Sequence, residues 1–137
     1  MKQMYRWITL VLVLASLLSA CAPKANTTTK VSPVTLEPID GTDFQRVILT
    51  EKAAQRLDIK TAEVSGTSIP YAAVIYDTEG NTWVYTNPAP LTFVRASIVI
   101  DRIEGDQAVL SQALDSGTAV VTLGVSELYG AETGVSK

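Results

Sequence analysis

Short apolar runs alternate with clusters of turn residues along the chain from residue 46 to residue 123. The runs are rich in Val, Ile, Tyr and Thr, and several of them alternate apolar with polar positions, which is the period of a strand with one buried face. The runs lie near residues 46–49, 58–64, 71–76, 82–86, 91–103, 108–111 and 118–123. Six or seven strands at this spacing, with one short helix, predict a mainly β domain built as a small barrel or sandwich.

The middle of the domain has the clearest pattern. Residues 77–81 supply turn chemistry, and residues 82–86 then alternate with Trp83 and Tyr85 on one face. We expect a hairpin in which these two aromatics pack in the core or across strands; the alternative is an interface pair, because aromatics dominate binding hot spots. Residues 71–76 are apolar on both faces, which predicts an interior strand.

Two prolines and an arginine distinguish the segment after residue 86. The prolines lie within residues 87–90 and cannot donate to a strand ladder, so we expect them to break it. The next run, 91–103, places Val94, Ala96 and Ile98 on one face and Arg95 on the other. This pattern predicts a half-buried strand with Arg95 on its solvated side.

Helical signals are limited to one short segment. Thr50 is a suitable N-cap, and residues 51–57 are good helix formers with Ala53, Ala54 and Leu57 at helical spacing. At the other end of the chain, glycines at 124 and 130 bracket what we expect to be a short exposed end.

The amino terminus has the organisation of a secretory signal. Lys2 and Arg6 precede an apolar run from Trp7 to Leu18, and the chain's single cysteine, Cys21, follows Leu18-Ser19-Ala20. The four residues Leu18 to Cys21 resemble the lipobox of bacterial lipoproteins. That resemblance implies cleavage before Cys21, a diacylglycerol on its thiol and commonly a further acyl chain on the new amino terminus.

Two other interpretations of this segment are weaker. The apolar run is shorter than the roughly 20 residues that a spanning helix needs. A catalytic thiol at Cys21 would lack a histidine to activate it, because the sequence contains none. We therefore expect residues 1–20 to be a signal peptide, and the acylated Cys21 to anchor the protein in a lipid bilayer of the cell envelope, on its extracytoplasmic side.

Residues 21–45 are rich in Thr, Pro, Ser and Asp and show no apolar period. They predict a flexible lipidated tether, which would reach about 80 Å if fully extended. The β-rich domain is then expected to cover residues 46–134.

Composition excludes several functions. Without residues 1–20, the chain has 9 of its 11 basic side chains and all 14 acidic ones, which gives a formal charge of −5. This charge argues against binding of nucleic acid. With no histidine and with both methionines inside the signal, we expect no metal and no other cofactor. The acids in probable turns lack the spacing of a calcium loop, and no nucleophile elbow or phosphate loop occurs, so we do not expect an enzyme.

The order of motifs resembles the membrane-proximal domain of periplasmic efflux adaptors, also called membrane fusion proteins, particularly those of the RND type. The opening segment is similar over residues 49–62 (LTEKAAQRLDIKTA), and the similarity continues through residues 69–77 (IPYAAVIYD), 80–85 (GNTWVY), 92–95 (TFVR), 103–106 (IEGD), 114–122 (LDSGTAVVT) and 127–132 (ELYGAE). Full adaptors insert a β-barrel domain, a lipoyl-like domain and a helical hairpin, whereas here Glu63 to Ser68 alone separate the first two pieces.

The resemblance implies an accessory protein or truncated adaptor that docks on an efflux permease or on a full-length adaptor. It does not carry over any metal ligand. An alternative function is that of an envelope lipoprotein with a binding or structural role unrelated to efflux, because a fold alone does not determine function. Ala22 follows Cys21 at the position where many lipoproteins that stay in the inner membrane have an aspartate. The outer membrane is therefore an alternative to the cell membrane as the site of the anchor.

Three residues are candidate partner contacts: Arg95, Arg102 and Tyr129. The two arginines also have a simpler interpretation. The arginines would be a solvated strand residue and a turn-adjacent charge of small individual energy.

Overall fold

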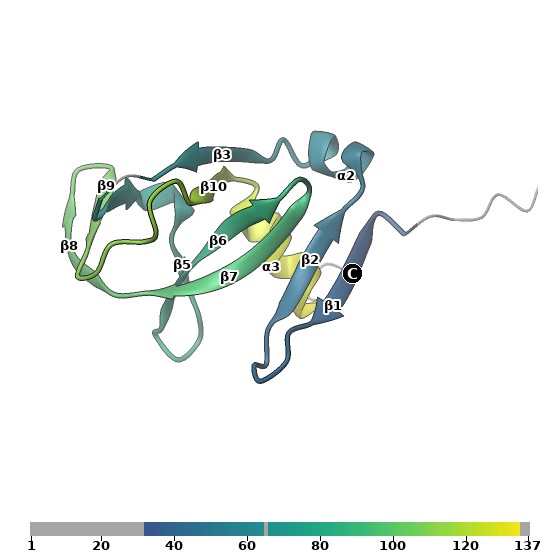
Figure 1. Ribbon diagram of the computed structural model, residues 1–137, viewed down its shortest axis with the longest axis horizontal. Coiled ribbons are helices and arrows are strands. Elements are labelled where there is room, and N and C mark those ends of the chain that lie inside the picture. Colours follow the sequence, from purple (N-terminus) through teal and green to yellow (C-terminus); the bar gives the residue numbers. More distant parts are fainter. Residues whose placement is uncertain (1–31, 65, 135–137) are drawn as a thin grey trace, which may run out of the picture. The chain divides into compact units, whose positions relative to one another are not determined.

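The computed structural model describes residues 32–64 and 66–134; the expected signal peptide, Cys21 and the rest of residues 1–31 lie outside the described residues. The described chain is mainly β, as predicted (Figure 1), with ten strands in two sheets. The elements are β1 (Val34–Pro38), β2 (Gln45–Leu49), α2 (Glu51–Arg56), β3 (Lys60–Glu63), β4 (Ser68–Pro70), the 3₁₀ turn η2 (Tyr71–Ala73), β5 (Ile75–Tyr76), β6 (Thr82–Ala89), β7 (Thr92–Ile98), β8 (Ile100–Glu104), β9 (Gln107–Leu110), β10 (Ala119–Leu123) and α3 (Val125–Thr133).

The larger sheet has the order β1-β2-β7-β6-β10-β3, with β5 paired to β6, and the smaller sheet has the order β4-β9-β8. All of these pairings are antiparallel. The larger sheet ends in two different strands, β1 and β3, so the described residues form an open, sandwich-like arrangement and not a closed barrel.

The two faces of the larger sheet bury different cores. Because strand side chains alternate, Tyr85 and Val84 point to opposite faces of β6. Tyr85 belongs to a cluster with residues of α2 and α3, including Ala53 and Leu128. Val84 belongs to a second cluster with residues of the smaller sheet, including Ile69. The larger sheet therefore lies between the two helices and the smaller sheet.

The hairpin expected around residues 77–81 and the short helix after Thr50 were predicted correctly. Across the 77–81 turn, Ile75 of β5 pairs with Trp83 of β6 and Tyr76 with Thr82. A second hairpin, β6–β7, pairs Tyr85 with Arg95. The Thr50 hydroxyl accepts a hydrogen bond from the Ala53 amide at 3.2 Å, which caps α2.

The ladder break expected at residues 87–90 is confirmed only in part: the β6–β7 register shifts between Thr86 and Ala89, but β6 itself continues through Pro88 to Ala89. The Asn87 side-chain amide donates to the carbonyl oxygens of Ala89 at 2.7 Å and Thr92 at 2.8 Å. These bonds hold the end of the hairpin together across the prolines.

Two expectations about the ends of the domain are wrong. Part of the expected tether, Val34–Pro38, is strand β1, which forms five residue pairs with β2. The expected exposed end is helix α3, whose Leu128 and Glu132 side chains are buried against the sheet. Both elements depend on partners elsewhere in the sequence and have little apolar period of their own.

Two expected strands are interrupted where the chain passes between the sheets. The segment 71–76 is not an interior strand: it leaves β4 in the smaller sheet, turns through η2 and enters the two-residue strand β5 in the larger one. The segment 91–103 likewise divides at Val99, with β7 in the larger sheet and β8 in the smaller. Each crossing leaves apolar side chains outside both cores.

Candidate functional site

The two crossings meet in an exposed group of side chains, here named the aromatic patch: Tyr71, Tyr76 and Val99. Their relative exposures are 38%, 49% and 65%. The tyrosine rings pack edge to face with centroids 6.5 Å apart, and their hydroxyl oxygens are 3.4 Å apart. The hydrogen bond with Tyr71 raises the pKa of the Tyr76 hydroxyl. Tyr76 and Val99 also line one open hollow of about 460 Å³.

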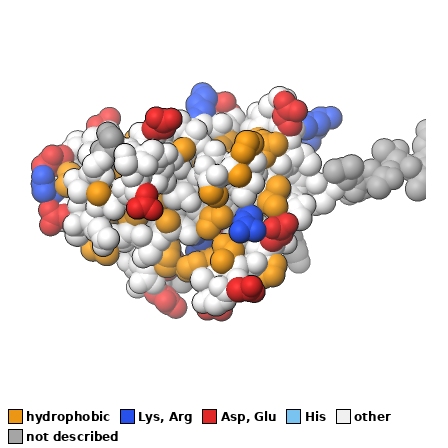
Figure 2. All heavy atoms as spheres, in the orientation of Figure 1, with side chains coloured by type: hydrophobic (Ala, Val, Ile, Leu, Met, Phe, Trp, Pro, Cys, Tyr) orange, Lys and Arg blue, Asp and Glu red, His pale blue; other side chains and the backbone are white. Residues whose placement is uncertain are grey.

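Two exposed acidic residues, Glu79 and Asp106, adjoin the patch. Glu79 contacts the Asn81 side chain, which lines the hollow. The backbone carbonyl of Asp106 accepts a hydrogen bond from the Tyr71 backbone amide at 2.8 Å. Arg102 on β8 lies between Asp101 at 2.8 Å and Glu104 at 2.7 Å, and these contacts raise the pKa of its guanidinium, the Glu104 hydrogen bond most. Figure 2 shows acidic and basic side chains gathered together at the β8 end of the domain.

The turn before β6 is organised around one carboxylate. Asp77 accepts hydrogen bonds from the Trp83 indole at 3.0 Å, from the Asn81 amide at 2.8 Å and from the Glu79 amide at 2.9 Å. These donors, the indole first, lower the pKa of Asp77 to about 2. Asp77 therefore closes the predicted turn with its own oxygens. Within residues 32–64 and 66–134, no three or more His, Cys, Asp or Glu side chains gather as a metal site.

The second charged group of interest is buried between the larger sheet and α3. Glu132 is 5% exposed. Its carboxylate accepts hydrogen bonds from the Arg95 Nη2 at 3.0 Å, from the backbone amide of Gln45 at 3.1 Å and from the Tyr85 hydroxyl at 2.5 Å. The Arg95 Nε also lies 2.9 Å from a carboxylate oxygen of Glu132. Burial, and then the bond to Glu132, raise the pKa of Tyr85 far above its usual value. We name this group the Arg95–Glu132 pair.

Aromatic rings enclose the guanidinium of this pair. The Arg95 Cζ lies 4.4 Å from the ring centroid of Phe44, 5.7 Å from that of Trp83 and 5.5 Å from that of Tyr129. The expectation of a solvated Arg95 is therefore wrong, since 10% of its side chain is exposed. The separation of 37 residues between Arg95 and Glu132 hid this pairing from sequence patterns.

The three candidate partner contacts thus divide. Arg95 and Tyr129 come together at α3 and serve packing within the domain. Arg102 lies on β8, half exposed, as the simpler interpretation predicted. Tyr85 and Phe93 are buried in the core, and Trp83 packs edge to face on Phe44 with centroids 4.8 Å apart. The exposed aromatics are instead Tyr71 and Tyr76, for which Pro70 before the run was an available signal.

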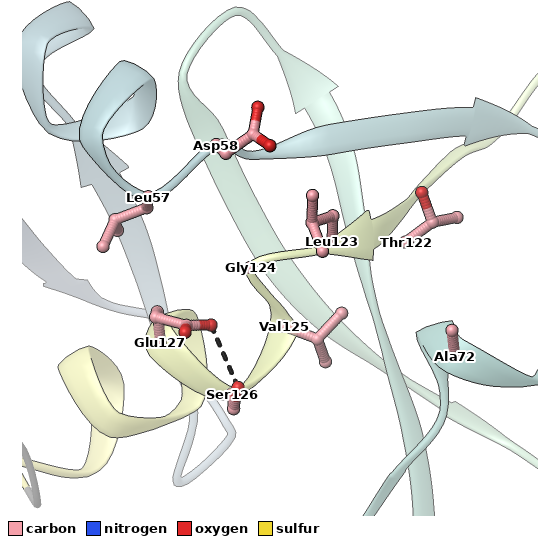
Figure 3. Close-up of a pocket in the computed structure, with 9 residues that line it drawn as sticks. All are labelled: Leu57, Asp58, Ala72, Thr122, Leu123, Gly124, Val125, Ser126 and Glu127. Carbon is pink, nitrogen blue, oxygen red and sulfur yellow. Dashed lines mark hydrogen bonds between the residues drawn. The ribbon is translucent and has the colours of Figure 1, made fainter.

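A further hollow, of about 470 Å³, lies beside the start of α3 (Figure 3). Asp58, Leu123 and Glu127 line it, and Glu127 accepts a hydrogen bond from the Ser126 hydroxyl at 2.9 Å. The two charged residues that line this hollow, Asp58 and Glu127, are both acidic, which disfavours binding of an anion at this helix end. The lining contains no histidine or lysine beside these carboxylates.

In the part of the chain that the structure describes, no helix has the length and apolar character needed to cross a membrane. No protein-family model, no curated protein and no solved structure matches this chain.

Proposed function

We propose that this protein is a lipid-anchored binding module on the extracytoplasmic side of a membrane, which docks on an efflux permease or on a full-length efflux adaptor. The observation that carries the proposal is the position of Cys21, which ends a lipobox-like sequence 13 residues before β1 begins at Val34. An acylated cysteine at that position would hold the domain close to a bilayer, because two or three acyl chains bind a membrane stably where one does not.

The start of β1 limits how far the domain can lie from its anchor. At most about 3.3 to 3.6 Å per residue, the segment from Cys21 to Val34 spans no more than about 45 Å. This is little over half of the reach expected for a tether ending at residue 45. A partner must therefore lie in or beside the membrane that carries the lipid.

The adaptor-like motifs support the choice of partner class. The matching residues 69–77 contain most of β4 together with η2 and β5, and the matching residues 80–85 and 92–95 lie at the start of β6 and of β7. Glu63 to Ser68 join the first two matching segments directly, so no domain is inserted between them that could bridge to a distant channel. Of the two adaptor activities, docking on the pump and bridging to a distant channel, we therefore propose docking for this protein.

The test is crosslinking in the native host, followed by solubilisation of the membranes and mass spectrometry of the proteins recovered with the tagged full chain. We expect a transport permease or an adaptor, lost in the Cys21→Ala variant and retained in the matched Thr28→Ala control. The mature wild-type chain should begin at Cys21 and carry acyl groups. Recovery of unrelated envelope proteins alone would contradict the efflux function, and an unmodified Cys21 would contradict the anchor.

A further inference from the structure

We infer that the aromatic patch and its acidic surroundings bind a basic segment with apolar side chains in the protein's membrane partner. This inference deepens the proposed docking function and rests on it. It adds the location of the docking surface, at the two sheet crossings, and the chemistry of the segment that the surface would receive.

The apolar part of the surface is suited to a protein contact. Tyr71, Tyr76 and Val99 leave between a third and two thirds of their area exposed. Tyr76 packs against Tyr71 and shares the hollow with Val99. Tyrosine is enriched in binding hot spots because it combines a large apolar ring with a polar end. The hollow of about 460 Å³ between Tyr76 and Val99 offers space for a side chain of the partner.

The charge of the surrounding surface selects the partner's chemistry. Between Gly66 and Thr118 the sequence has six acidic and two basic side chains, with no lysine. Arg95 is buried against Glu132, and Arg102 is already held by Asp101 and Glu104. Glu79 and Asp106, the two acids that adjoin the patch through Asn81 and Tyr71, form no ion pair among the described residues, so the charge that they add beside the patch is negative. Complementary charges guide association and reject wrong partners, so a lysine- or arginine-bearing segment is favoured.

The same charges argue against two other occupants. A bilayer with anionic lipids attracts basic surfaces and would repel the acids that adjoin the patch, such as Glu79 and Asp106. A second copy of the chain, related by a two-fold axis through the patch, would bring these acids against their own copies. Both occupants remain distinguishable outcomes of the test.

The experiment is site-specific photocrosslinking of the full chain in its native host. The photoreactive amino acid p-benzoylphenylalanine replaces Tyr71, Tyr76 or Val99 in turn, and Lys52 or Gln55, which are exposed on α2, in the controls. Mass spectrometry then identifies the crosslinked peptide. We expect crosslinks at the patch positions, several-fold above the controls, to a peptide with net positive charge and apolar residues.

Charge variants test the electrostatic part separately. The Glu79→Gln and Asp106→Asn substitutions should each lower the crosslinking yield at Tyr76 by about two- to fivefold, the range expected for a single exposed ion pair. The matched control is Glu51→Gln with Glu63→Gln, which removes two exposed acids outside the patch and should leave the yield unchanged.

The outcomes separate this inference from the proposed function. Patch crosslinks to an acidic peptide, to lipid or to a second copy would overturn it, as would yields no higher than at α2. If a permease or adaptor is still recovered in a Cys21-dependent manner, the proposed function survives that failure. Patch crosslinks to a basic segment of an envelope protein unrelated to transport would instead support the surface and contradict the efflux function.

Discussion

Neutralising Glu132 is expected to destabilise the domain more than the loss of any exposed charge. In the Glu132→Gln variant, Arg95 keeps its charge between three aromatic rings while its carboxylate partner is removed. The Tyr85 hydroxyl and the backbone amide of Gln45 also lose a charged hydrogen-bond acceptor. The perturbation therefore acts on one carboxylate that joins β2, β6 and β7 to α3.

The magnitude follows from burial. The two side chains of the Arg95–Glu132 pair are 10% and 2% exposed, so the unpaired arginine cannot recover much solvation by water. Removing one partner of a buried pair typically costs about 3–5 kcal/mol. With a denaturant slope of about 1–3 kcal/mol per M of urea for a small protein, the unfolding midpoint should fall by about 2 M.

Urea unfolding of the full chain in mild detergent, monitored by circular dichroism, measures this shift in the unfolding midpoint. The matched control is Glu37→Gln, because Glu37 and Arg46 form an exposed pair at 3.0 Å whose loss should cost less than about 1 kcal/mol. A combined Tyr85→Phe, Arg95→Met and Glu132→Leu variant should recover most of the loss, since a buried pair can be replaced by apolar side chains. If Glu132→Gln costs no more than Glu37→Gln, the pair does not hold α3 in place and our reasoning is refuted.

Three further predictions concern backbone conformation and pH. Gly124 has a φ of +82° and an added Cβ would lie 2.2 Å from the Ile59 Cδ1, so Gly124→Ala should cost about 2–4 kcal/mol in the free energy of unfolding. Gly117→Ala, at φ +83° with open space around it, should cost about 1–2 kcal/mol in the same urea assay; equal costs would contradict the clash. Because the pKa of Tyr85 is raised by folding, its stabilisation is complete below pH 10 and is lost as the pH rises further, so Tyr85→Phe should flatten the alkaline decline in stability. Because the pKa of Asp77 is lowered from 3.8 to about 2, its stabilisation is present above pH 4 and is lost as the pH falls towards 2. Carboxyl titration by NMR should show this value directly, and a midpoint near 3.8 would contradict the Trp83 hydrogen bond.

Local patterns predicted the elements whose signals lie within a few residues. The alternation of Trp83, Val84 and Tyr85 placed β6 and its two faces correctly, and Thr50 marked the start of α2. These segments carry their own period or cap, so the tertiary structure had little to add.

The features that escaped prediction depend on distant partners. Strand β1 has exposed side chains and exists through its pairing with β2, while α3 contains Gly130 and is held by the burial of Leu128 and Glu132. The aromatic patch was hidden because an apolar run looks the same whether it fills one sheet or crosses between two. Apolar spacing reports that a segment is buried somewhere, and it does not report in which sheet.

Strand β1 would give the domain a mechanical direction in the lipid-anchored arrangement that we propose. A pull on the chain from its amino-terminal side enters β1 at Val34, which pairs with Leu49, at the opposite end of the strand pair from Pro38 and Gln45. A force across the strand would load the five residue pairs one after another from Val34, whereas a force along it would load all five together. The domain should therefore open easily under a force applied across β1 at Val34 and resist a force applied along β1.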